Sequence, residues 1–101
     1  MTKIQTLKGF RDFYPEQMAF LSWLYQKVRQ VSESFGFQEY EGPIVEPLDL
    51  YSVKSEELAS KRGFTWPDKT GKLLILRPEM TPTLARMVAS KENSLTFPVK
   101  W

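Results

Sequence analysis

The sequence predicts an α/β fold, of the α+β type, in which a long helix packs beside part of an antiparallel sheet. Apolar residues recur at steps of three and four between Glu16 and Phe35, which is typical of an amphipathic helix. Two short apolar segments, at 64–66 and 73–76, flank the turn-forming sequence PDKTG, which is typical of a β-hairpin. The composition, 42% apolar and 26% charged, is that of a globular protein with a packed core.

Length and composition restrict the possible chemistry. A chain of 101 residues is about one small domain, and its net charge of +2 is too weak a signal for nucleic-acid binding by itself. The sequence has no cysteine and no histidine, which excludes thiolate metal sites and Ser-His-Asp or Cys-His catalysis by these residues alone. No metal site is therefore predicted, and any chemistry must rest on Asp, Glu, Arg, Lys, Thr and backbone groups.

The sequence also indicates a compartment. The first residues lack the apolar core of a signal peptide, and no apolar run approaches the ~20 residues of a membrane span. We therefore expect no membrane association and a cytoplasmic location, with an organelle matrix as the other reducing compartment that fits.

The chain begins with an aromatic arm and a long helix. The segment from Thr6 to Pro15 is predicted to be an extended, partly buried arm, whose aromatic residues more often fill a core or a subunit interface than stack on bases. A helix is predicted from Glu16, with Gly36 as its C-terminal stop. Its apolar positions are Met18, Leu21, Leu24, Tyr25, Val28, Val31 and Phe35.

Strand patterns follow the helix. Phe37–Glu41 alternates apolar and polar residues, and the pattern resumes at 44–46 after Gly42 and Pro43. Because proline cannot donate to a ladder, this strand is predicted to lie at a sheet edge or to carry a bulge at Pro43, with Pro47 as its end. A helical turn is predicted at Leu48–Val53.

The second half is predicted to hold four further elements. These are a short capped helix at Ser55–Ala59, the hairpin, a helix with Thr81 as N-cap and Pro82 as first helical residue, and the start of a strand at Phe97–Trp101.

The stretch LRPEMTPTLAR places Glu79 where a strand meets a helix start. Its carboxylate could accept hydrogen bonds from a ligand's ammonium group, or it could complement the helix dipole and pair with Arg77 or Arg86. Local pattern alone favours the structural interpretation, and it favours helix capping over ligand binding for Thr81. For each arginine, an ion pair with a neighbouring acid is favoured over a grip on a carboxylate or phosphate.

Three segments in order go beyond any one motif: GFRDFYP, then FGFQEYEGPIVEP after the long helix, then LILRPEMTPTLAR after the hairpin. Together they resemble the amino-terminal part of the catalytic domain of histidyl-tRNA synthetases, which are class II aminoacyl-tRNA synthetases. The resemblance implies that the helix and the segment with Pro43 form motif 1, the dimer-forming element. It also implies that Glu79 and Thr81 bind the α-amino group of histidine, and it reverses the preference for the structural interpretation of Glu79.

The resemblance further implies what the parent enzyme does. It activates histidine with ATP and Mg²⁺ to histidyl-adenylate and transfers the aminoacyl group to tRNA(His), as a homodimer. The arginine-bearing motif 2 and motif 3 are expected beyond Trp101, so residues 1–101 are interpreted as a fragment without catalytic residues of its own. We expect this fragment alone to be inactive and not to bind ATP tightly.

The sequence departs from the family pattern at two places, and alternatives stay open. The turn at Trp66–Gly71 is a slightly unusual version of the family's aromatic-Asp-Gly turn. Met80 stands where a glycine is common, which affects the geometry expected of the loop. The same architecture occurs in the histidine-binding regulatory subunit of ATP phosphoribosyltransferase, and related folds occur in the prolyl and threonyl enzymes. A non-catalytic domain that dimerises through its long helix is the alternative of a different class. Because sheet strands are expected to be missing, self-association or pairing with the missing remainder is predicted.

Overall fold

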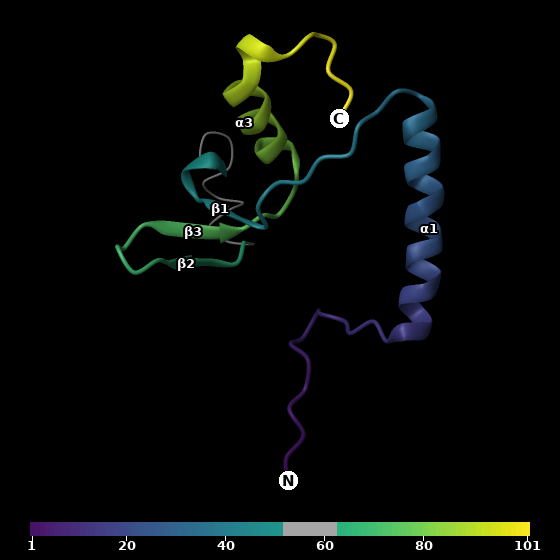
Figure 1. Ribbon diagram of the computed structural model, residues 1–101. Coiled ribbons are helices and arrows are strands. Elements are labelled where there is room, and N and C mark those ends of the chain that lie inside the picture. The colour runs from purple at the N-terminus through teal and green to yellow at the C-terminus, as the bar shows by residue number, and fades with distance from the viewer. Residues whose placement is uncertain (52–62) are drawn as a thin grey trace. The chain divides into compact units, whose positions relative to one another are not determined.

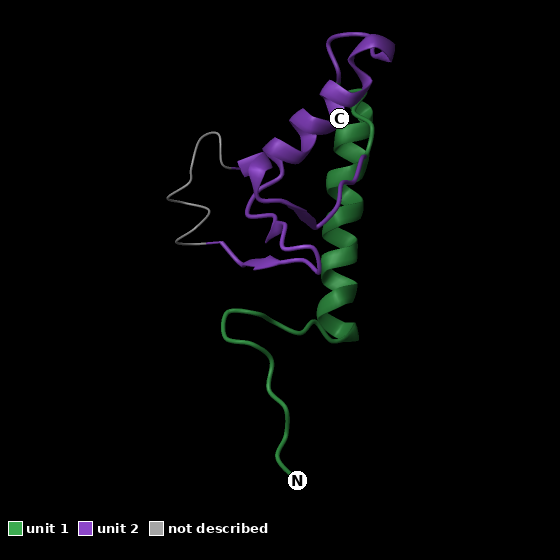
Figure 2. Cartoon of the chain, turned by 90° about the vertical axis from the view of Figure 1, so that its left-hand side faces the viewer, with its two compact units in different colours: residues 1–39, 100–101 green, residues 40–99 purple. Residues whose placement is uncertain are grey.

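The computed structural model describes residues 1–51 and 63–101, and it confirms a mixture of helices with a small antiparallel sheet (Figure 1). The elements are α1 (Pro15–Ser34), β1 (Val45–Pro47), β2 (Thr65–Pro67), β3 (Leu73–Leu76), α3 (Thr81–Lys91) and the 3₁₀ helix η1 (Glu92–Ser94). The predicted helix at Ser55–Ala59 lies outside the described residues. The chain forms two compact units, one of residues 1–39 and 100–101 and one of residues 40–99 (Figure 2).

Helix α1 is the main element of the first unit, and it begins and ends close to the predicted residues. Pro15 is its first residue, where a fixed φ suits the helix and the missing N–H costs no bond. The Gln17 Oε1 atom accepts a hydrogen bond of 3.0 Å from the Tyr14 backbone N–H, which supports the first turn. The predicted stop is confirmed, because Gly36 has a φ of +81° and donates to the Glu33 carbonyl at 2.9 Å.

None of the side chains of α1 is buried. The predicted packing of this helix beside the sheet therefore stays a prediction. On its surface, the rings of Phe20 and Trp23 stack with centroids 6.0 Å apart. At its far end, Arg29 makes a two-pronged ion pair with Glu39, with N–O distances of 2.8 and 3.0 Å. This pair ties the helix to the segment that follows it.

The predicted burial of the aromatic arm was wrong. The arm is extended, with a turn at Gly9, but Phe10 and Phe13 are each 47% exposed and Tyr14 is more exposed still. The physical reason is that these rings project from an irregular segment rather than from a packed helix or strand. Thr6 and Asp12 close the arm locally through a hydrogen bond of 2.6 Å.

Two predicted strands are also absent from the described residues. The segment Phe37–Glu41 and the segment Phe97–Trp101 are both irregular. They meet through the Gln38 N–H, which donates to the Lys100 carbonyl at 2.9 Å. Alternation of apolar and polar residues is not enough for a strand, because a strand needs a ladder of paired neighbours.

The second unit is built on a three-stranded antiparallel sheet with the order β1-β3-β2. The central strand β3 places Ile75 opposite Glu46 of β1 and Thr65 of β2. The predicted hairpin is thus confirmed as β2 and β3. The edge position predicted for the strand near Pro43 is confirmed too, because β1 is an edge strand and Pro43 precedes it.

The hairpin turn is organised by one carboxylate. Asp68 Oδ1 accepts hydrogen bonds from the Thr70 hydroxyl at 2.7 Å, the Thr70 N–H at 2.8 Å and the Lys72 N–H at 3.0 Å. Gly71 has a φ of +86°, a conformation that only glycine adopts without strain. These bonds hold the pKa of Asp68 below its usual value, and the Thr70 hydroxyl contributes most.

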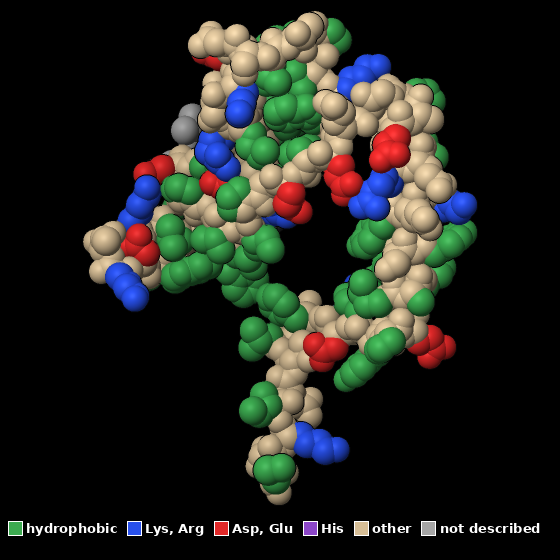
Figure 3. All heavy atoms as spheres, in the orientation of Figure 1, with side chains coloured by type: hydrophobic (Ala, Val, Ile, Leu, Met, Phe, Trp, Pro, Cys, Tyr) green, Lys and Arg blue, Asp and Glu red, His purple; other side chains and the backbone are tan. Residues whose placement is uncertain are grey.

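The core of the second unit lies on β3. Ile75 is fully buried, and Tyr51 packs with it at 5% exposure, together with the half-buried Leu48 and Leu50. Residues 49–51 are helical, which agrees with the predicted turn as far as the described residues reach. On the face drawn in Figure 3, apolar side chains gather over β2 and β3, where Trp66 and Leu73 stay partly exposed.

Among residues 1–51 and 63–101, no helix is both long enough and apolar enough to span a membrane.

Candidate functional site

The candidate site is the junction between β3 and α3, where the LRPEMTPTLAR stretch lies. The predicted N-cap was wrong by one residue, because Thr81 is the first helical residue and Met80 is the cap. The Met80 backbone, at φ −93° and ψ −19°, is already close to helical, and its carbonyl accepts the first helix hydrogen bond from the Leu84 N–H at 3.0 Å. The Thr81 side chain is therefore not needed as a cap, and it is exposed.

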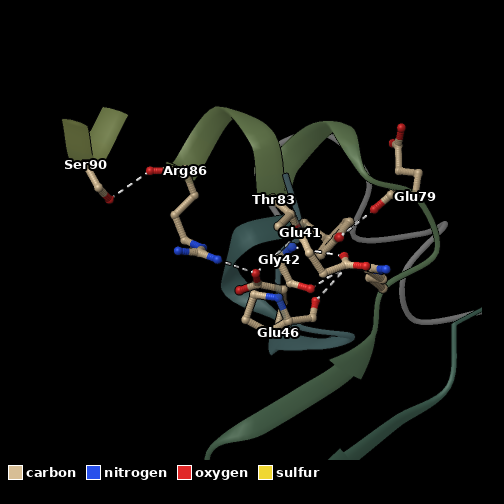
Figure 4. Close-up of polar contacts among 10 residues, drawn as sticks. Glu41, Gly42, Glu46, Glu79, Thr83, Arg86 and Ser90 are labelled. Carbon is tan, nitrogen blue, oxygen red and sulfur yellow. Dashed lines mark hydrogen bonds and ion pairs between the residues drawn. The ribbon is translucent and has the colours of Figure 1, made fainter. Parts of the chain in front are cut away.

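Glu79 is exposed, and its carboxylate points away from the polar contacts around it (Figure 4). The structural interpretation of Glu79, an ion pair with Arg77 or Arg86, is not what the structure shows. Both arginines are held by other acids, and among the described residues no hydrogen bond or ion pair is found for the Glu79 carboxylate. It also lies two positions before α3, so it is not a first-turn residue of that helix.

Arg77 holds the end of β3 to the segment before β1. Its Nη1 donates to the Glu41 carboxylate at 3.0 Å, to the Gly42 carbonyl at 2.9 Å and to the Pro43 carbonyl at 3.3 Å. The Arg77 N–H donates in addition to the Ile44 carbonyl at 2.9 Å. The Arg77 hydrogen bond lowers the pKa of Glu41, and the Gly42 N–H lowers it further. The preference for an ion pair at Arg77 is thus confirmed.

Arg86 makes the corresponding contact on the helix side. Its Nη2 lies 2.6 Å from Oε1 of Glu46, a carboxylate on β1 that is only 3% exposed. The fully buried Thr83 hydroxyl donates to the same oxygen at 3.3 Å. A buried carboxylate is stable only when paired, so this contact fixes α3 on β1.

At Gly42 the backbone lies close to α3. A Cβ atom placed there would lie 2.4 Å from Thr83 Cγ2, 3.3 Å from Met87 Sδ and 3.5 Å from Met80 Cε. Only glycine fits this position without a shift of its neighbours. The apolar side of α3 therefore rests on the backbone that leads into β1.

Tyr51 supports the junction from the core. Its hydroxyl donates to the backbone carbonyl of Glu79 at 2.9 Å, across 28 positions of sequence (Figure 4). This contact joins the Glu79 backbone to the buried cluster around Ile75.

Sequence reasoning did not identify three residues that build the site, namely Gly42, Glu46 and Tyr51. Gly42 was interpreted only as a break in a strand, and Glu46 only as part of one. The signal at Glu46 was an acid inside a short apolar strand, which predicts a buried partner. Nothing in the local sequence marks Tyr51, because its partner is a distant backbone carbonyl.

The charged side chains around the junction are mostly paired with one another. No group of three or more His, Cys, Asp or Glu side chains that could hold a metal ion is found among residues 1–51 and 63–101. Arg77 and Arg86, which could clamp phosphate, are already paired with carboxylates. What the junction offers instead is one exposed anion beside a helix start, which suits a cationic ligand group.

Comparison with known proteins gives one family. A family model described as histidyl-tRNA synthetase matches residues 9–100. The histidine–tRNA ligase of Opitutus terrae is 46% identical over 101 residues, which cover 100% of this chain and 23% of that protein. The chain thus spans about a quarter of the length of the curated relatives it matches.

Solved structures agree with the sequence comparison. A Bacillus halodurans structure described as an ATP phosphoribosyltransferase regulatory subunit/histidyl-tRNA synthetase has a TM-score of 0.84 at 27% identity, covering 98% of this chain and 26% of that one. The histidyl-tRNA synthetase of Nostoc has a TM-score of 0.80 at 28% identity, covering 96% of this chain and 23% of that one.

Proposed function

The chain belongs to the histidyl-tRNA synthetase family, and from that premise we propose that it carries the part of a histidine–tRNA ligase that holds the α-amino group of histidine. Glu79 and Thr81 are the proposed ligands. One observation supports this assignment most. The Glu79 carboxylate is exposed and unpaired among the described residues, while Arg77 and Arg86 are each occupied by another acid.

Electrostatics explains why this arrangement suits an ammonium group. Arg77 and Arg86 are each paired with another acid. Neither of these two cations close in sequence therefore competes with a ligand for the Glu79 carboxylate. A carboxylate accepts a charge-assisted hydrogen bond from an ammonium group, and such bonds are stronger than neutral ones. The Thr81 hydroxyl, exposed at the start of α3, adds a second acceptor for the same group.

In the proposed parent reaction, the histidine carboxylate attacks the α-phosphate of ATP and pyrophosphate leaves. A terminal hydroxyl of tRNA(His) then attacks the carbonyl carbon of histidyl-adenylate, and AMP leaves. ATP, Mg²⁺ and tRNA are proposed to bind through residues outside this chain.

The enzyme is proposed to act in the cytoplasm as a homodimer, with Pro43 at the dimer interface. Within this scheme residues 1–101 form the amino-terminal part of the catalytic domain, with motif 1 and the amino-acid loop.

The test uses a chimera in which this chain replaces the aligned residues of the Opitutus terrae histidine–tRNA ligase. Histidine-dependent ATP–pyrophosphate exchange is measured for the chimera and for its Glu79→Gln variant. Loss of a charge-assisted hydrogen bond should lower kcat/KM for histidine about 10- to 100-fold. Glu92→Gln is the control, since Glu92 is an exposed acid in η1.

The 101-residue chain alone is measured in the same assay, and we expect no exchange from it. Exchange by the chain alone would contradict the proposal that ATP binds elsewhere. An active chimera whose Glu79→Gln variant keeps full kcat/KM would contradict the role of Glu79.

A histidine-binding regulatory subunit of ATP phosphoribosyltransferase is the second candidate. It is favoured by the Bacillus halodurans structure, whose description carries both names. Such a protein would use the same Glu79 site to bind histidine as a signal. Histidine binding without pyrophosphate exchange by the protein that carries this chain, together with stimulation of ATP phosphoribosyltransferase, would favour this second function.

A further inference from the structure

We infer that Tyr51 is a positioning residue for the amino-acid site, because its hydroxyl fixes the backbone of Glu79. This inference rests on the function proposed above. It assigns a role to a residue that contacts only the backbone of Glu79, not its carboxylate, and that lies 28 positions away from it in sequence.

Tyr51 is rigidly held. It follows β1 in a helical turn, its N–H donates to the Leu48 carbonyl at 2.9 Å, and its ring packs against the fully buried Ile75. At 5% exposure the phenol has little access to water, so its hydroxyl needs a protein partner. Among the described residues, the hydroxyl donates to the Glu79 carbonyl at 2.9 Å.

The loop from β3 to α3 is tied at both ends to the segment around β1. Arg77 binds the Gly42 and Pro43 carbonyls on the strand side, and Arg86 binds Glu46 on the helix side. Between these two ties lie Pro78, which has no N–H to donate, and Glu79. The Tyr51 hydroxyl therefore fixes the middle of the loop, at the residue proposed to meet the ligand.

The expected consequence is preorganisation. The Glu79 side chain is exposed and can rotate, but its Cα position is set by the peptide group that Tyr51 binds. A ligand then meets a carboxylate whose backbone is already ordered, which lowers the entropic cost of binding. Because the α-amino group stays bound in the ground state and in the transition state, the benefit should appear in KM for histidine rather than in kcat.

Tyr51→Phe tests this inference, because it removes the hydroxyl and keeps the ring. In the chimera, KM for histidine should rise about three- to tenfold with kcat and KM for ATP unchanged, as expected for one lost hydrogen bond. Inhibition by histidinol, which keeps the α-amino group, should weaken to the same extent. Inhibition by imidazolepropionate, which lacks that group, should stay the same. Tyr25→Phe is the matched control, since Tyr25 is an exposed tyrosine on α1.

A double-mutant cycle separates positioning from a general loss of stability. In a Glu79→Gln background, Tyr51→Phe should change KM for histidine no further, because the two residues act through one contact. On the 101-residue chain itself, the carbonyl carbon resonance of Glu79 should shift in Tyr51→Phe and not in Tyr25→Phe.

The outcomes distinguish the two claims. If Glu79→Gln leaves exchange unaffected, the proposed function fails. If Glu79→Gln weakens histidine binding but Tyr51→Phe leaves both KM for histidine and the Glu79 carbonyl resonance unchanged, only the positioning role of Tyr51 is overturned. An equal rise in KM for histidine and in KM for ATP would likewise overturn the positioning role, because that result indicates a general structural effect.

Discussion

Gly42 is the residue on which the contact between α3 and the segment before β1 depends most directly. Its missing side chain lets the Thr83 methyl group approach the backbone, while Met80 and Met87 fill the space on either side. Thr83 is fully buried and β-branched, so it has no alternative rotamer that leaves its hydroxyl on Glu46.

Gly42→Ala should therefore lower the free energy of unfolding by about 1–3 kcal/mol, the usual cost of overpacking. The second variant, Thr83→Ser, removes the Cγ2 atom that lies 2.4 Å from the added Cβ and keeps the hydroxyl. Adding it to Gly42→Ala should recover most of the loss. Urea unfolding of the two single variants and the double variant measures this, and additive losses would contradict the proposed contact.

At the residue scale, sequence reasoning identified which residues matter at the junction better than it identified their partners. Glu79 stood out because an acid between an apolar strand and a helix start is unusual. The partners of Arg77 and Arg86, Glu41 and Glu46, lie 36 and 40 positions away. Local spacing therefore suggested Glu79 as the ion-pair partner, and only tertiary structure shows that both arginines are engaged elsewhere.

The hairpin shows what one side chain contributes at the element scale. Three donors converge on Asp68 Oδ1 and close the turn between β2 and β3. Because the folded turn lowers the pKa of Asp68 relative to the unfolded chain, its contribution to stability is complete above the usual carboxyl range. That contribution is lost as pH falls through the lowered pKa.

Thr70→Val should raise the pKa of Asp68 toward its usual value, since the Thr70 hydroxyl is the largest cause of the shift. The acid-dependent part of the hairpin's stability should then be smaller, and its loss should be complete at a higher pH than in the wild type. A pH titration of the Asp68 carboxyl resonance by NMR measures both effects. An unchanged Asp68 titration in the Thr70→Val variant would show that the hydroxyl bond is absent in solution.

A helix or turn could be predicted where its sequence pattern lies within one segment. A strand is less predictable from its own residues, because its formation depends on pairing with a segment elsewhere in the chain. The apolar period of α1 and its Pro15 and Gly36 boundaries are all contained in one segment, and so is the PDKTG turn. The segment Phe37–Glu41 has a strand-like pattern but no ladder, and the sequence gives no measure of which segments meet. For the same reason the sequence could not determine how far the arm, expected to be partly buried in a core or a subunit interface, is covered.

For the whole molecule, the distribution of apolar surface predicts association. Helix α1 has no buried residue, and it exposes the large apolar side chains of Phe20, Trp23, Tyr25, Val28 and Val31. Several large exposed apolar side chains on one helix are typical of a protein that binds another surface. This agrees with the homodimer proposed above without requiring that the same face be used.

We therefore expect the 101-residue chain to sediment as a concentration-dependent oligomer. Trp23→Lys should shift the equilibrium toward monomer, because a charge must then be desolvated in the interface. Gln26→Lys on the same helix is the control, since it adds the same charge at a polar position. Sedimentation as a monomer at every concentration would count against association and would favour an apolar face that is covered within the parent protein.

The strand order β1-β3-β2 has a consequence for synthesis on the ribosome. The central strand is the last of the three to be made, so β1 has no neighbour to pair with while the chain is still growing toward Leu76. The nearby β2 and β3 can join as soon as both have emerged, and β1 is added to their free edge afterwards. Glu46 cannot form its ion pair until Arg86 has been synthesised. In a nascent chain that stops before α3, the Glu46 carboxylate therefore lacks the cation that pairs with it in the folded protein.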